Sequence, residues 1–125
     1  MKIGYLIAAA IAAPSLSLPV QAADQVDIGK REFELSCALC HGSSGKGDGR
    51  YEPVLQGPHM PDLTMISKRN GGVFPKERVY ETIDGRASAA THGTPQDREM
   101  PVWGSRFEPA RIEALVAYLH QLQEK

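Results

Sequence analysis

Two cysteines and a histidine stand close together in the first half of the sequence, as Cys37-Ala38-Leu39-Cys40-His41, and the chain has no other cysteine. The spacing C-x-x-C-H is typical of covalent c-type haem attachment. Two thiols three residues apart on one helical turn can each form a thioether to the same edge of a porphyrin. The next residue then lies beneath the ring, where an imidazole nitrogen can bind iron. The motif predicts one covalent haem c on Cys37 and Cys40, with His41 as an iron ligand.

Two other kinds of site use cysteine pairs of this spacing. A thiol–disulfide redox site is one, but such sites usually accompany a βαβ pattern, and strand-rich stretches are missing here. A zinc site is the other, and it needs further Cys or His ligands. The sequence has no second C-x-x-C pair, and its three other histidines are scattered. The motif therefore favours haem attachment.

The second axial ligand of the iron must come from elsewhere in the chain. Met100 lies in a stretch with Pro and Gly on its C-terminal side, which favours an irregular loop that can present a side chain. It follows His41 by 100 − 41 = 59 residues, enough chain to pass around a haem. Met60 follows by only 60 − 41 = 19 residues, and His92 lies in a polar loop. We predict Met100 as the ligand, with Met60 and His92 as the alternatives.

The N-terminus has the pattern of a secretory signal peptide. A lysine near the start is followed by an apolar run over residues 3–13, and small residues lead up to Ala22. The run is far shorter than the roughly 20 residues that a membrane-spanning helix needs. We therefore expect a signal peptide over 1–22, cut after Ala22 or Ala23, export to the periplasm, and no stable membrane insertion. A single domain over 24–125 remains.

The charge and composition of the chain bear on its partners and on the size of its hydrophobic core. Without the signal peptide, 14 − 1 = 13 Lys and Arg face 15 Asp and Glu, a formal charge of 13 − 15 = −2. Because there is no basic excess, nucleic acid is not expected as a partner. Aromatic residues make up only 6% of the chain, so the core must be small or filled by a cofactor.

Helical patterns occupy part of the chain, and long loops the rest. The predicted helices cover residues 27–39, 63–68, 75–84 and 109–122. The apolar face expected for the first helix consists of Ile28, Phe33, Leu35 and Leu39. Gly29 within that helix is unfavourable by about 1 kcal/mol relative to Ala, which makes sense if another helix crosses there. The loops over 42–49 and 86–108 are expected to pass close to the haem.

With these residues in hand, the chain resembles class I cytochromes c over essentially all of the part after the signal peptide. Gly29 and Phe33 are similar to the contacts of that family's N-terminal helix, and residues 115–119 to the C-terminal helix that crosses it. Pro61 begins a stretch that resembles the family's Pro-x-Leu, whose proline carbonyl accepts a hydrogen bond from the proximal histidine. The resemblance therefore implies that Pro61 is the partner of His41.

Three further stretches, 45–50, 83–86 and 100–104, resemble a subgroup of small bacterial carriers with a single haem. This likeness supports Met100 as the axial ligand. It also implies Arg86 and Trp103 as neighbours of the haem propionates, with a surface charge and a core aromatic as their alternative roles. The lysine-rich ring of mitochondrial cytochromes c has no counterpart in this slightly acidic chain, so the same docking partners are not expected.

The resemblance implies an all-α fold of three or four helices and long loops around one haem. The function expected is that of a soluble periplasmic monohaem cytochrome c, an electron carrier and not an enzyme. We expect a monomer that moves single electrons between redox proteins such as membrane oxidoreductases or periplasmic dehydrogenases, through small, weak contacts. Two alternatives stay open: a dedicated cytochrome subunit of a larger periplasmic oxidoreductase complex, and a haem enzyme or sensor with a labile distal site.

Overall fold

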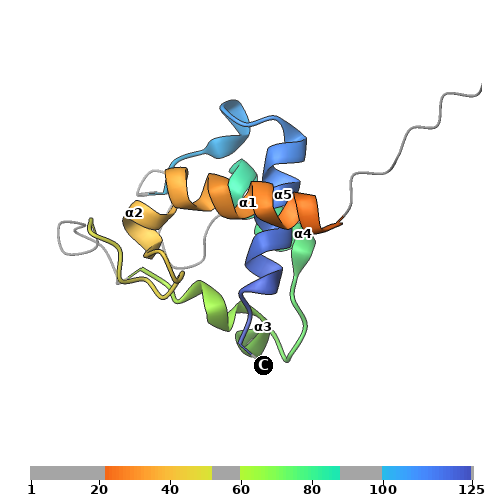
Figure 1. Ribbon diagram of the computed structural model, residues 1–125. Helices are drawn as coiled ribbons and strands as arrows, with labels where there is room; N and C mark the ends of the chain where they lie inside the picture. The colour runs from red at the N-terminus through yellow and green to blue at the C-terminus, as the bar shows by residue number, and fades with distance from the viewer. Residues whose placement is uncertain (1–21, 52–59, 88–99, 125) are drawn as a thin grey trace, which may run out of the picture.

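The computed structural model describes residues 22–51, 60–87 and 100–124, which form helices and loops with no strand among them (Figure 1). The helices are α1 (Ala22–Ser36), α2 (Ala38–His41), α3 (Ile66–Arg69), α4 (Lys76–Asp84) and α5 (Pro109–Gln121), with 3₁₀ turns η2 (Leu63–Met65) and η3 (Trp103–Ser105). The predicted all-α fold is confirmed. Two of the five described α-helices are single short turns, which explains why three or four were expected. No helix in the described part of the chain combines the length and apolar character needed to cross a membrane.

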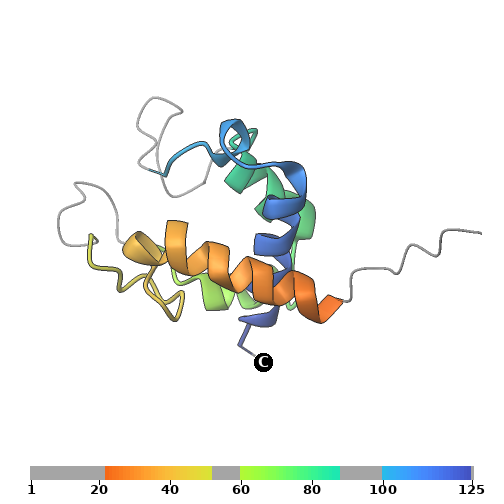
Figure 2. The ribbon, with the colours of Figure 1, turned by 45° about the horizontal axis from the view of Figure 1, so that its top comes forward.

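The crossing of α1 and α5 is the central packing feature of the fold, and it is visible in both ribbon views (Figures 1 and 2). Gly29 of α1 lies at this crossing. A Cβ atom added there would lie 1.9 Å from the carbonyl oxygen of Ala114 in α5. Only a residue without a side chain lets the two backbones approach so closely. The predicted helix crossing at Gly29 is thus confirmed.

The hydrophobic core lies around this crossing. Phe33, Ile112 and Leu115 are its most completely buried large side chains. The rings of Phe33 and Tyr118 meet at a centroid distance of 5.4 Å with a tilt of 55°. Full burial of each such side chain contributes about 1.5–3 kcal/mol. The core therefore joins α1 to α5, and α4 adds Val79 to the same cluster.

The predicted apolar face of α1 was wrong for three of its four residues. Phe33 is buried, but Ile28, Leu35 and Leu39 are 51%, 76% and 48% exposed. The reason is the helical period of 3.6 residues. Gly29 and Phe33, four apart, face α5, whereas Ile28 and Leu35, seven apart, share the side that faces away from it.

Helix α1 also begins earlier than predicted, at Ala22 rather than at residue 27. Asp24 in its first turn complements the positive end of the helix dipole and favours this start. The predicted signal peptide lies outside the described residues except for Ala22, as do the loop residues 52–59 and 88–99, with His59 and His92 among them.

The C-terminal end of α5 holds the segment that follows residue 60. The side-chain oxygen of Gln123 accepts a hydrogen bond from the backbone N–H of Ser67 at 2.8 Å, and its amide nitrogen donates to the carbonyl of Leu63 at 2.8 Å. The backbone N–H of Glu124 donates to the carbonyl of Thr64 at 3.0 Å. These bonds tie the C-terminal residues to the middle of the chain and help to set the position of η2 and α3.

Candidate functional site

A cavity of about 390 Å³ opens between α1, α2, the segment after residue 60, α4 and the segment before η3. Its volume is in the range of small-molecule sites, about 300–1,000 Å³. Its inner wall is apolar and belongs to the hydrophobic core. The side chains of this wall include Phe33, Val79, Ile83, Leu115 and Leu119. The few large side chains of the core thus leave an apolar cavity inside the domain, which a cofactor could fill.

The cysteine motif lies at one wall of this cavity. Cys37 occupies the turn between α1 and α2, and its N–H donates to the carbonyl of Phe33 at 2.9 Å. The N–H of His41 donates to the carbonyl of Cys37 at 2.9 Å, so the motif forms one helical turn. Cys37 and His41 both line the cavity, and His41 is only 7% exposed. Cys40 is partly buried on the same turn but is not among the cavity-lining residues.

The surroundings of Cys37 disfavour a thiol–disulfide redox role. Burial, and next the charge of Glu32 and of Cys40, raise the pKa of Cys37 to about 12. Reactive cysteines in disulfide exchange need a lowered pKa, because the thiolate is the nucleophile. A thiol kept neutral inside an apolar cavity lacks that property.

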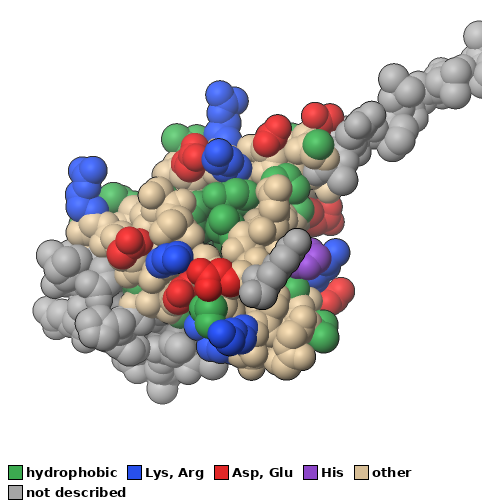
Figure 3. Space-filling model, turned by 60° about the horizontal axis from the view of Figure 1, so that its bottom comes forward, with side chains coloured by type: hydrophobic (Ala, Val, Ile, Leu, Met, Phe, Trp, Pro, Cys, Tyr) green, Lys and Arg blue, Asp and Glu red, His purple; other side chains and the backbone are tan. Residues whose placement is uncertain are grey.

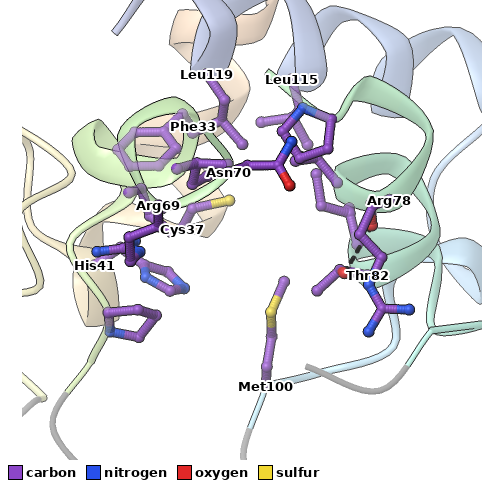
Figure 4. A pocket seen from close by; sticks show the side chains of 16 residues that line it. Phe33, Cys37, His41, Arg69, Asn70, Arg78, Thr82, Met100, Leu115 and Leu119 are labelled. Carbon is purple, nitrogen blue, oxygen red and sulfur yellow. Dashed lines mark hydrogen bonds between the residues drawn. The ribbon is translucent and has the colours of Figure 1, made fainter. Parts of the chain in front are cut away.

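Met100 reaches the same cavity from a different part of the chain. It is partly buried, packs against the core and lines the cavity together with His41. Figure 4 shows the two side chains pointing toward one space, His41 from α2 and Met100 from the segment before η3. Met60 is buried but is not among the lining residues, and its carbonyl lies against the backbone of Gly47. Among the described candidates for the second ligand, Met100 is the one that shares the cavity with His41.

The remaining predicted residues divide between the cavity and its surroundings. Pro61 lines the cavity beside His41. Trp103 stacks on Phe107 at a centroid distance of 4.8 Å and is not a lining residue. Arg86 pairs with Asp84 and lines a separate hollow between α4 and α5. The structure therefore brings Cys37, His41, Pro61 and Met100 together and leaves Arg86 and Trp103 outside that group.

Four polar residues of the cavity were not predicted from the sequence. They are Arg69, Asn70, Arg78 and Thr82 (Figure 4). Arg78 and Thr82 are one helical turn apart in α4, and the hydroxyl of Thr82 donates to the carbonyl of Arg78 at 2.8 Å. In the sequence, Arg78 and Thr82 each precede a buried residue of α4, Val79 and Ile83. This pattern could have placed them at the edge of the helix face that meets the cavity.

These residues fit the haem that the cysteine motif predicts. Haem is a flat apolar ring with two carboxylates on one edge and iron at its centre. The apolar wall suits the ring, the guanidinium groups of Arg69 and Arg78 suit the carboxylates, and His41 and Met100 supply a nitrogen and a sulfur for iron. Cys37 lines the cavity as well, as a thioether to the ring would require.

Comparisons with known proteins agree with this geometry. The family model for cytochrome c matches residues 26–123. A cbb3-type cytochrome c oxidase subunit CcoP from Azospirillum sp. (strain B510) is 33% identical over 110 residues, which is 86% of this chain and 32% of that protein. A cbb3-type cytochrome c oxidase subunit FixP from Sinorhizobium medicae is 31% identical over 99 residues, which is 79% of this chain and 30% of that protein.

Among solved structures, the chain is similar to one from the reducing HAO-like protein complex of Kuenenia stuttgartiensis, with a TM-score of 0.62 and 21% identity. The match covers 90% of this chain and 50% of that chain. At this identity the likeness concerns the fold. The chain spans about a third of the length of the curated relatives it matches.

Proposed function

The chain belongs to the cytochrome c family and binds haem c covalently, and from this premise we propose that it is the electron-transfer domain of a larger periplasmic oxidoreductase complex. The relatives that carry this proposal are named as subunits of cbb3-type cytochrome c oxidases. Export through the N-terminal signal peptide over 1–22 brings the domain, residues 24–125, to the periplasm.

Different residues of the cysteine motif and the cavity would attach the haem and bind its iron. Cys37 and Cys40 would hold the haem by two thioethers, and His41 and Met100 would bind its iron. When bound, haem supplies one-electron redox chemistry, and methionine–histidine ligation raises its potential. If His41 and Met100 both bind the iron, no coordination site would be left open for a substrate. The role is that of an electron carrier and not of an enzyme.

Other residues of the cavity orient the ligands and exclude water. With iron on one ring nitrogen of His41, the carbonyl of Pro61, which lines the same cavity, would be the acceptor for the other ring N–H and would fix the orientation of the imidazole. Arg69 and Arg78, which line the cavity, would supply the positive charge for the propionates. The apolar wall around Phe33 and Leu115 keeps water from the ring, which favours the less charged, reduced state.

The observation that favours a subunit over a free carrier is the exposed apolar side of α1. Ile28 and Leu35 lie on one side of this helix and are half or more exposed. Leu39, exposed as well, lies between the two cysteines. Exposed large apolar side chains near one another are typical of interaction surfaces. A partner subunit that covers them would lie next to the cysteine motif, where the haem would be attached.

The charge distribution supports contact at short range. Lys and Arg side chains are interspersed with Asp and Glu on the face that Figure 3 shows. A mixed surface gives weak long-range steering, which needs a field of one sign. A carrier that diffuses between partners gains speed from steering, whereas a resident subunit does not need it.

The test is the size of the haem-containing particle in the native host. We expect haem absorption of the wild-type protein to elute from a size-exclusion column with a complex far larger than the domain. In Leu35→Glu the haem absorption should move to the fractions of the isolated domain, with an unchanged visible spectrum. The reason is that a carboxylate on the apolar side of α1 would block docking. Val73→Glu, an exposed position on the loop before α4, is the control and should leave the complex intact.

A wild-type protein that elutes alone would contradict the subunit role. The second candidate, a soluble carrier between membrane oxidoreductases or periplasmic dehydrogenases and an acceptor, would then take its place.

A further inference from the structure

Helix α1 carries a buried carboxylate outside the cavity. Glu32 is 7% exposed, and its Oε2 atom accepts hydrogen bonds from Arg111 of α5, 3.1 Å from Nε and 2.5 Å from Nη2. Its other oxygen accepts a hydrogen bond from the hydroxyl of Ser36 at 2.8 Å. A carboxylate in such a place is costly to desolvate unless paired. Glu32 therefore holds the guanidinium of Arg111 in a defined position.

The guanidinium of Arg111 also contacts the aromatic ring of Phe107. Its central carbon lies 4.5 Å from the centroid of the Phe107 ring. Phe107 in turn stacks on Trp103, at a centroid distance of 4.8 Å and an interplanar angle of 19°. Trp103 begins η3 and follows Met100 by 103 − 100 = 3 residues. A continuous line of contacts thus runs from α1 to the segment that carries Met100.

A close contact with the end of α4 also holds the 3₁₀ turn η3 in place. A Cβ atom at Gly104 in η3 would lie 1.8 Å from a carboxylate oxygen of Asp84 and 2.6 Å from its carbonyl oxygen, so the backbone of η3 lies directly against the end of α4. The Phe107–Trp103 stack and this close approach together fix η3. Only Pro101 and Val102, both exposed, lie between η3 and Met100.

We propose that Glu32 is a positioning residue for Met100, acting through Arg111, Phe107 and Trp103. This inference rests on the proposed ligation of iron by Met100. With Glu32 in place, Arg111 stays over Phe107, the ring stack stays closed, and the segment before η3 presents the methionine sulfur to the cavity. Arginine is needed because its planar group can bind a carboxylate with two nitrogens and stack on a ring at once, which lysine cannot do.

The test uses the haem-loaded protein and two readouts in one urea titration. The near-infrared charge-transfer band of the methionine–iron(III) bond reports ligation by Met100, and far-UV circular dichroism reports the helices. In Glu32→Gln and in Phe107→Leu we expect the band to be lost at a lower urea concentration than the helical signal, with a wider gap than in the wild type. The double variant should widen the gap no further, because both changes break the same line of contacts.

Two further variants distinguish positioning from plain loss of stability. Ile112→Val removes one buried methylene from α5 beside Arg111 and should move both midpoints together. Arg111→Lys keeps the charge but loses the planar group, and it should behave like Glu32→Gln. If the midpoints of Glu32→Gln and Phe107→Leu fall together as in Ile112→Val, Glu32 is only a structural residue and the inference is overturned. A wild-type protein without the band would overturn the assignment of Met100 itself and the inference with it.

Discussion

Cys37 shows how the surroundings of a residue decide its chemistry. The spacing C-x-x-C serves disulfide exchange where a thiol pKa is lowered. Here burial and the nearby charge of Glu32 raise the pKa of Cys37 to about 12, and His41 lies in the same cavity. The sequence motif predicted haem attachment from residue types alone. The raised pKa, which depends on Glu32 and on the depth of the cavity, needed the fold.

The covalent attachment is testable at these residues. We expect Cys37→Ala combined with Cys40→Ala to lose its haem to acid–acetone extraction, because no thioether remains. Cys40→Ala alone is the matched control and should keep its haem in the protein fraction through the thioether of Cys37. Haem that stays with the polypeptide of the double variant would contradict the assignment of both cysteines.

At the scale of helices, the period of apolar residues predicted the position and the buried side of α5, but neither the start nor the buried side of α1. Helix α5 agrees closely with its prediction because its apolar residues form one clear stripe. Helix α1 does not, because its exposed leucines suggested a face that the crossing at Gly29 excludes. A helix that meets its neighbour through a glycine has a weak apolar period in its sequence, since backbone atoms rather than apolar side chains make the contact. Leu35, exposed in the domain, lies on the side of α1 that the proposed partner subunit would cover.

The close crossing of α1 and α5 gives a prediction about stability. Gly29→Ala places a methyl group 1.9 Å from the carbonyl oxygen of Ala114. We expect the free energy of unfolding to fall by about 1–3 kcal/mol from overpacking, reduced by the gain in helix propensity of about 1 kcal/mol. Lys30→Ala, exposed on the same helix, is the control and should change it by no more than about 0.5 kcal/mol. Urea unfolding followed by circular dichroism measures both, and equal stability of Gly29→Ala and wild type would argue against so close a crossing.

At the scale of the whole molecule, the cavity is built from segments distant in the sequence. Pro61, Arg78 and Met100 come from three separate stretches, and Gln123, which follows α5, holds η2 beside the cavity. The family resemblance could anticipate Pro61 and Met100, because their motifs are local. The position of Arg78 in the cavity could not be anticipated, since an arginine on an amphipathic helix is most often a surface charge. The ion pair of Glu32 and Arg111 spans 79 residues and leaves no local pattern.

We propose that His41 and Met100 both bind the iron of the covalently held haem. The most direct test is the near-infrared absorption spectrum of the oxidised protein, wild type and Met100→Ala. We predict a methionine–iron(III) band in the wild type that disappears in the variant, with covalent haem retained and a lower reduction potential because the thioether ligand is lost. A wild type without the band, or a variant that keeps both band and potential, would contradict the account.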